Sequence, residues 1–229
     1  MPVILDITLT LDTEQLLYRQ GIGAPDRVKP GVVAQTKGLL DSVYEKHLLK
    51  PAIAYQIHTV TGMERDRLHL EDGTVLHSRL LSVSLSGAKA LGIAIYTIGA
   101  GLEETVSDYF QRNEPLKAFL LDGIGNSFLD SLSHQVCQIM SREASSRGYK
   151  ASSPVNPGVP GWPISDQQAL FRLVPAGEAG IHLTEHAMMV PRKSLSTAFG
   201  IGTEVPEWTQ AESCRRCNLK DTCPYRLRT

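Results

Sequence analysis

The sequence predicts an α+β fold in which long helices pack against a twisted antiparallel sheet. Apolar or alternating runs of strand length occur at residues 3–11, 53–60 and 91–98. The tripeptide Glu71-Asp72-Gly73 lies between two further short runs and is typical of a hairpin turn, which joins antiparallel neighbours. A helical pattern of apolar residues also extends over 115–147. Together these features favour an antiparallel sheet with at least one long helix.

The first third of the chain predicts one strand, one helix and then more strands. Residues 3–11 alternate between apolar and polar side chains, which indicates a half-buried strand. A helix is expected to begin near Pro30 and to stop before Pro51, because proline supplies no amide donor inside a helix. Three histidines are expected on exposed faces of the strands that follow: His58, His69 and His77.

The middle of the chain predicts a buried strand followed by two helices. Residues 91–98 are apolar on both faces, as in a central strand. Gly99 and Gly101 would allow a sharp turn into a helix that begins near Leu102. The long helix over 115–147 should then end at Gly148. Its expected buried side comprises Leu116, Phe119, Leu120, Ile124, Phe128, Leu132, Val136 and Ile139, with Gly123 and Gly125 allowing close packing against a neighbour.

Polar and functional residue types accumulate between residues 154 and 202. A loop rich in proline and glycine at 154–163 leads to a short helix, for which Ser165 and Gln168 have capping-box spacing. Residues 181–189 and 193–201 predict a strand pair that turns at residues 190–192. On such a strand, adjacent residues such as Glu185 and His186 would point to opposite faces.

Several short motifs in this region follow one another in a specific order. They are Pro157-Gly158-Val159, Leu183-Thr184-Glu185-His186, Met189, Pro191 and Ser194-Leu195-Ser196, with weaker similarity at 96–104 and 121–126. In their order and spacing they resemble the reactivation (activation) domain of cobalamin-dependent methionine synthase. The resemblance is closer still to free-standing bacterial and archaeal relatives of that domain. It covers most of the chain and implies the same fold and a role in corrinoid chemistry.

The chain departs from the family pattern where that domain binds S-adenosylmethionine (AdoMet). The family has an arginine three residues before the Pro-Gly-Tyr loop and a tyrosine within it, and these places hold Pro154 and Val159 here. A proline cannot reproduce the bidentate grip of a guanidinium on a carboxylate. The departure therefore predicts weak or absent AdoMet binding.

The resemblance implies a set of cofactor-binding residues: Glu185, Pro157, Gly158, Lys193 and Ser194. Glu185 would face a cleft. Lys193 and Ser194 offer hydrogen-bond donors just after a turn, suited to a corrin amide, a phosphate or a carboxylate of a partner. The alternative for all of these polar residues is an ordinary solvated surface.

Three of the four cysteines lie in a tail of the form C-x2-C-x5-C-P, at Cys214, Cys217 and Cys223. Such a run resembles the cysteine ligands of iron-sulfur clusters, and the free-standing relatives often carry a similar tail. Basic residues around it would offset the charge of an anionic cluster. A 4Fe-4S cluster is the first expectation, and the alternatives are structural zinc or no metal at all. Cys137, on the long helix, is the candidate fourth ligand, and the alternative is a small core residue.

Composition and motifs limit the remaining possibilities. The chain has 229 residues, 42% of them hydrophobic, with a net charge of −1, which gives no general attraction to nucleic acid or to a membrane. Without a basic leader at its start, or an apolar run approaching the ~20 residues that span a bilayer, a cytoplasmic protein is expected. The expected division is an activation-domain-like unit at 1–205 and a cysteine-rich metal-binding tail at 206–229.

The favoured function is an iron-sulfur accessory protein that docks on a corrinoid protein and supports reductive activation of its cobalamin. One alternative is an AdoMet-dependent methyl donor related to methionine synthase. The other is a zinc-stabilised interaction module without a redox role. No phosphate-binding loop, catalytic triad or pair of catalytic carboxylates can be recognised in the sequence.

Overall fold

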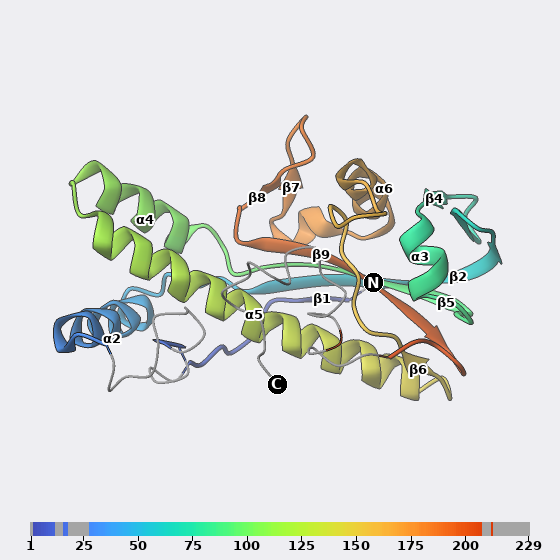
Figure 1. Ribbon diagram of the computed structural model, residues 1–229, viewed down its shortest axis with the longest axis horizontal. Helices are drawn as coiled ribbons and strands as arrows, with labels where there is room; N and C mark the ends of the chain where they lie inside the picture. Colours follow the sequence, from blue (N-terminus) through green and yellow to red (C-terminus); the bar gives the residue numbers. More distant parts are fainter. Residues whose placement is uncertain (1, 12–15, 18–27, 208–211, 213–229) are drawn as a thin grey trace.

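A computed structural model of the chain describes residues 2–11, 16–17, 28–207 and 212 (Figure 1). The strands are β1 (Val3–Ile4), β2 (Ala52–Met63), β3 (Arg67–Leu70), β4 (Val75–His77), β5 (Ala90–Thr97), β6 (Lys150–Ala151), β7 (His182–Leu183), β8 (Met189–Val190) and β9 (Ser194–Gly202). The helices are α2 (Pro30–Glu45), α3 (Arg79–Ser84), α4 (Gly101–Gln111), α5 (Pro115–Ser145) and α6 (Gln167–Leu173), with short 3-10 turns at η2 (Ile164–Asp166) and η3 (Ala176–Ala179).

The main sheet has seven strands in the order β4-β3-β2-β5-β9-β6, with β1 paired to β2. All of these pairs are antiparallel. The two longest ladders join β5 to β2 on one side and to β9 on the other, so β5 is central. The predicted α+β class with a twisted antiparallel sheet and long helices is confirmed.

Each face of the sheet carries its own hydrophobic core. On one face, Ala94, Tyr96 and Phe199 pack against α2, α4 and α5. On the other, Leu91, Ile93 and Ala198 pack against α3, α6 and η3. Figure 1 shows α5 crossing one face of the sheet, while α3 and α6 lie on the other. Because both faces are covered, residues 91–98 are apolar throughout, and their predicted central position is confirmed.

The predicted long helix is confirmed as α5, and Gly148, with a φ of +73°, follows its end. Two residues assigned to its buried side are wrongly placed, since Leu116 and Phe119 are exposed. They lie in the first turns of α5, which form a hairpin with α4 at one end of the sheet (Figure 1). None of the helices in the described ranges, α5 included, combines the length and apolar character that a bilayer crossing requires.

Two expectations for the first third of the chain were wrong. The strand predicted over residues 3–11 is limited to Val3–Ile4, because only these residues pair with β2. His58 is buried rather than exposed, and its Nε2 lies 3.0 Å from the carbonyl oxygen of Leu173 at the end of α6. This contact satisfies an imidazole that the strand pattern alone would place in solvent.

The strand predicted at 193–201 is confirmed as β9, but its predicted pairing with residues 181–189 was wrong, because the two halves have different partners. β9 is an inner strand of the main sheet, between β5 and β6. The first half instead forms the small hairpin β7–β8, whose turn contains Glu185 and His186. The two residues therefore do not lie on a strand. The peptide bond from Val190 to Pro191, at the end of this hairpin, is cis.

The short helix predicted after the proline-rich loop is confirmed as α6, although its capping box is absent. The chain enters α6 through η2, and no side chain caps the amino end of either element. Asp166 accepts a hydrogen bond of 3.1 Å from the indole nitrogen of Trp162 instead. This bond connects the start of α6 to the buried tryptophan of the 154–163 loop.

Candidate functional site

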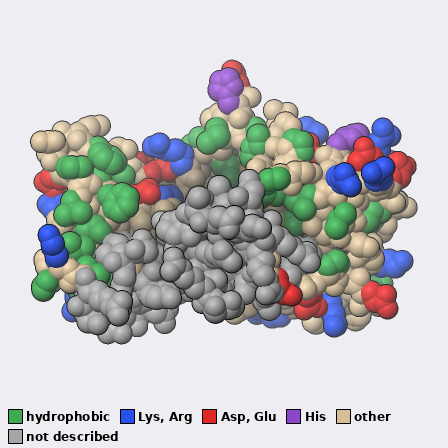
Figure 2. Space-filling model, viewed as in Figure 1, with side chains coloured by type: hydrophobic (Ala, Val, Ile, Leu, Met, Phe, Trp, Pro, Cys, Tyr) green, Lys and Arg blue, Asp and Glu red, His purple; other side chains and the backbone are tan. Residues whose placement is uncertain are grey.

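The β7–β8 hairpin projects from the sheet and exposes several functional groups at its tip (Figures 1 and 2). Glu185 and His186 are exposed in its turn, and Met188, just after them, is 58% exposed. Within the described part of the chain, neither Glu185 nor His186 has a hydrogen bond or an ion pair. The tip thus presents a carboxylate, an imidazole and a thioether to solvent.

Three hydrogen bonds, two of them between backbone groups, close the turn of the β7–β8 hairpin. The amide of Thr184 donates to the Met188 carbonyl at 2.8 Å, and the amide of Ala187 donates to the Thr184 carbonyl at 3.0 Å. The Thr184 hydroxyl accepts from the Met188 amide at 3.1 Å. Ala187 has a φ of +58°, a left-handed conformation that costs an L-residue with a Cβ atom about 1–2 kcal/mol.

A buried amide anchors the hairpin to the rest of the domain. Gln167, at the start of α6, donates from Nε2 to the Ala187 carbonyl at 2.7 Å and accepts from the Ser196 hydroxyl at 2.8 Å. Asn156 donates to the Ser196 carbonyl at 2.8 Å. A continuous set of polar contacts therefore joins the 154–163 loop, β9, α6 and the hairpin.

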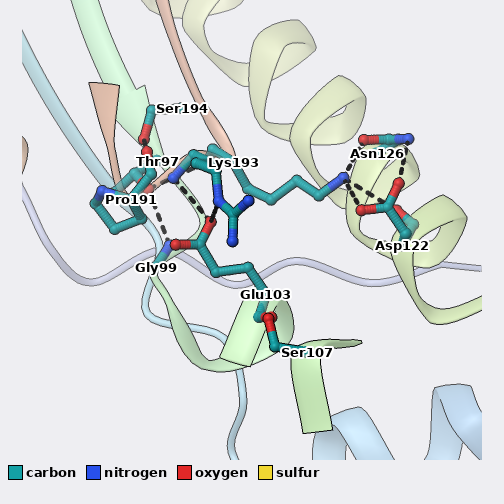
Figure 3. A network of polar contacts seen from close by, with 10 residues as sticks. Thr97, Gly99, Glu103, Ser107, Asp122, Asn126, Pro191, Lys193 and Ser194 are labelled. Atoms are coloured by element: carbon teal, nitrogen blue, oxygen red, sulfur yellow. Dashed lines mark hydrogen bonds and ion pairs between the residues drawn. The ribbon is translucent and has the colours of Figure 1, made fainter. Parts of the chain in front are cut away.

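Lys193 connects the start of β9 to α5. Its Nζ lies 2.7 Å from Oδ1 of Asp122 and 2.5 Å from Oδ1 of Asn126, as Figure 3 shows. The Lys193 side chain is only 13% exposed, and its stem crosses α5 at Gly125, where an added Cβ would lie 3.3 Å from the Lys193 Cε. The prediction that Gly125 allows close packing against a neighbour is confirmed.

The residue before Lys193 makes a parallel connection to α4. Glu103 Oε2 accepts a hydrogen bond of 2.8 Å from the Arg192 backbone amide and lies 4.0 Å from the Arg192 Nε. We define the α4–α5/β9 junction as Glu103, Asp122, Asn126, Arg192 and Lys193. Its charges pair internally, which fixes the position of the chain directly after the hairpin.

Apolar side chains are exposed on the faces of α4 and α5 that carry Glu103 and Asp122. Phe119 precedes Asp122 by one turn of α5, and Phe110 follows Glu103 by two turns of α4. Their exposed fractions are 67% for Phe119 and 59% for Phe110. The helix hairpin therefore combines paired charges with uncovered aromatic rings, a combination typical of protein contact surfaces.

The structure brings only some of the predicted cofactor-binding residues together. Lys193 and Ser194 are adjacent at the start of β9, and Glu185 is on the hairpin that precedes them. The polar groups of these three residues differ in whether they have a partner within the described part of the domain. Lys193 is paired within the junction, and the Ser194 hydroxyl donates to the Pro191 carbonyl at 2.6 Å, while the Glu185 carboxylate has no such contact with any described residue.

Pro157 and Gly158 lie in the loop that pairs with β9 through Val155. Gly158 has a φ of +91°, and its amide donates to the Trp162 carbonyl at 2.9 Å. This loop borders an open cavity of about 600 Å³, which His77 and Arg79 also line. Gly158 lines this cavity, whereas Pro157 does not.

Cys137 is half-buried on α5. It lines a cavity of about 360 Å³ together with Glu207 and Glu212, and Glu212 is two residues before Cys214 in the sequence. It shares a second cavity with His134, as expected for residues one helical turn apart. Burial, with a smaller contribution from Asp130, raises the pKa of the Cys137 thiol.

The predicted metal ligands Cys214, Cys217 and Cys223 lie outside the described residues. Over the ranges that the structure does describe, no group of three or more histidine, cysteine, aspartate or glutamate side chains could hold a metal ion.

Sequence reasoning missed three residues of this region: Asp122, Asn126 and Gln167. The spacing of Asp122 and Asn126, four apart on a predicted helix, places them on one face and was the available signal. No signal was available for Gln167, because its two partners come from segments 20 and 29 residues away along the chain.

The sheet order, the long α5 and the projecting β7–β8 hairpin together define an activation-domain-like fold. The chain has the fold of the solved MetH reactivation domain bound to AdoHcy, with a TM-score of 0.59 over 81% of this chain and 71% of that chain. The two sequences are 14% identical over the matched region. No protein-family model and no curated protein matches this chain.

Proposed function

We propose that this protein is an accessory factor of corrinoid metabolism, which docks on a corrinoid protein and helps to return its cobalamin to the reduced state. The single observation that carries the proposal is the fold, which matches a MetH reactivation domain over most of both chains. In this proposal the cobalamin is held by a partner protein.

The docking surface in this proposal combines the hairpin tip and the α4–α5/β9 junction. The tip contributes Glu185 and Met188, and the junction holds Lys193 and Ser194 at the foot of the hairpin. Phe110 and Phe119 extend the surface along the helix hairpin. Uncovered aromatic and methionine side chains suit a flat apolar macrocycle and the protein surface around it.

We also propose that residues 206–229 form a metal-binding tail, separate from the activation-domain-like unit at 1–205. Cys214, Cys217 and Cys223 would ligate a 4Fe-4S cluster, with Cys137 as the fourth ligand. Support for this assignment comes from Glu207 and Glu212, which belong to residues 206–229 and line the same cavity as Cys137. Ligation would require the Cys137 thiol to lose its proton, which its burial opposes and a bound metal favours.

When bound, such a cluster supplies one low-potential electron, which converts cob(II)alamin to cob(I)alamin while the cluster is oxidised. The test is to reduce the protein anaerobically with dithionite, remove the excess reductant and add a corrinoid protein in the cob(II)alamin state. We expect cob(I)alamin absorption to appear in proportion to the protein added. An unchanged cob(II)alamin spectrum, with a cluster present and reduced, would contradict the proposed electron transfer.

A second candidate function is AdoMet-dependent methyl donation, favoured by one observation. The solved domain with this fold was bound to AdoHcy, and here the loop that carries Pro157 and Gly158 borders a cavity of about 600 Å³. Pro154 and Val159 oppose this function, because neither can bind a carboxylate as an arginine does. Calorimetric titration with AdoMet at two temperatures decides the matter, since micromolar binding would favour methyl donation and no heat at either temperature would count against it.

A further inference from the structure

The β7–β8 hairpin is more rigid than a solvent-exposed loop needs to be. Three hydrogen bonds close its turn, and Gln167 holds it from below through the Ala187 carbonyl. Ala187 itself is buried and keeps a left-handed backbone conformation although it has a Cβ atom. A strained residue persists only where its surroundings hold it in place, and such residues concentrate at functional sites.

The exposed tip makes no contribution to the folding of the domain through side-chain contacts among the described residues. Glu185 and His186 have no hydrogen bond or ion pair within those residues, and Met188 is more exposed than buried. The side chains of Glu185 and His186 therefore make no polar contact with the described part of the domain. A rigid projection with unused polar groups is suited to enter a cleft in another molecule, because the entropic cost of ordering it has already been met.

From these features we infer that the β7–β8 hairpin is an insertion element that enters a cationic cleft of the corrinoid-binding partner and determines which partner is accepted. This inference rests on the proposed function, and it adds how the hairpin engages the partner and the chemistry of the opposing surface. The Glu185 carboxylate pairs with a lysine or arginine of the partner, and the Met188 side chain packs on the apolar wall of the cleft. His186 supplies a hydrogen bond at the rim.

The charge of the hairpin is the argument for a cationic cleft. Glu185 is the acidic group of the turn, and within the described residues no lysine or arginine of this chain pairs with it. The nearby cations of the junction, Arg192 and Lys193, are already paired with Glu103 and Asp122. The hairpin therefore presents an uncompensated carboxylate on a rigid support, and its complement must come from the partner.

Two variants test the inference against a matched control. The double variant E185Q/H186Q removes the charge and the imidazole with little change of volume, and Glu178→Gln makes the same carboxylate-to-amide change at an exposed position outside the hairpin. Ala187→Gly tests rigidity, because glycine adopts a φ of +58° without strain and gives the unfolded chain more freedom. The probe is the cobalamin-binding domain of a cobalamin-dependent methionine synthase, loaded with cob(II)alamin.

Binding is measured by anaerobic calorimetry in low and high salt. We expect E185Q/H186Q to weaken binding about tenfold in low salt, equivalent to about 1.4 kcal/mol, while Glu178→Gln binds as the wild type does. The difference between the wild type and E185Q/H186Q should narrow in high salt. Ala187→Gly should weaken binding severalfold while its melting temperature stays within a few degrees of the wild-type value.

The outcomes separate this inference from the proposed function. Wild-type affinity in the E185Q/H186Q variant would overturn the insertion element and leave corrinoid docking standing. Equal losses in E185Q/H186Q and Glu178→Gln would also overturn it, because the effect would then reflect overall charge. A wild-type protein that does not bind the probe would overturn both proposals.

Discussion

Replacing Lys193 with methionine tests the α4–α5/β9 junction, which positions the hairpin and the start of β9. The substitution removes the ammonium group and keeps an unbranched side chain to pack over Gly125, where the Lys193 stem now lies. The substitution also removes the contacts of the ammonium group with Asp122 at 2.7 Å and with Asn126 at 2.5 Å. The measurement therefore isolates the charged contacts from the packing of the stem.

The expected loss of stability follows from how well each partner is shielded. Hydrogen bonds to charged groups contribute about 1.5–3 kcal/mol, whereas exposed ion pairs contribute about 0–1 kcal/mol. The Lys193 side chain is 13% exposed and that of Asp122 is 48% exposed, so water can solvate only the carboxylate once the lysine is gone. We expect a loss of about 1.5 kcal/mol, or about 3–6 °C in melting temperature for a chain of this size.

Urea denaturation at low ionic strength is the assay, because guanidinium would screen the interaction. Lys150→Met is the matched control, since Lys150 is exposed and its Nζ lies 4.0 Å from Glu207. It should change the free energy of unfolding by less than about 0.5 kcal/mol. Equal effects of the two substitutions, or no coupling between Lys193→Met and Asp122→Asn in a double-mutant cycle, would refute the reasoning.

Further predictions concern the core and the response to pH. Gly101→Ala should lower the free energy of unfolding in urea by about 2–3 kcal/mol, because its Cβ would lie 2.6 Å from the Leu48 carbonyl oxygen. Gly38→Ala should raise the free energy of unfolding by about 0.5–1 kcal/mol, because Gly38 lies on a helix with open space around its Cβ position. A destabilising Gly38→Ala would contradict the predicted difference between the two glycines. Burial and the hydrogen bond to Glu143 raise the pKa of Tyr55 to about 12. The folded state therefore holds this proton more tightly than the unfolded state, so the contribution of Tyr55 is fully present below pH 10 and is lost as the pH rises from 10 to 12. Spectrophotometric titration should show a late-ionising phenol that Tyr55→Phe removes, and an unchanged titration curve would contradict the assignment.

The sequence predicts the central features of the fold where local pattern and tertiary environment agree. The 91–98 strand is apolar on both faces because helices cover both faces of the sheet, and the 115–147 helix has a continuous apolar stripe. Both predictions are confirmed. The errors occur where a distant partner overrides the local pattern, as with His58, whose imidazole contacts a carbonyl at the end of α6.

The candidate site was harder to predict than the fold. Motif order located Glu185, Lys193 and Ser194, but no periodic pattern distinguishes a two-residue strand from a longer one, so the hairpin turn was assigned to a strand. Gln167, which acts across the fold, became apparent only once its partners were in place. The exposure of Phe119 likewise depends on where α5 extends past the sheet.

Metal and sulfide measurement tests the proposed iron-sulfur function most directly. The protein is produced in iron-replete cells and purified without oxygen, and the variant Cys217→Ser is prepared in parallel. We expect a brown wild-type protein with about four iron and four acid-labile sulfide ions per chain, and a variant that has lost most of both. A colourless wild-type protein that contains zinc, or no metal at all, would contradict the proposed electron-donating role.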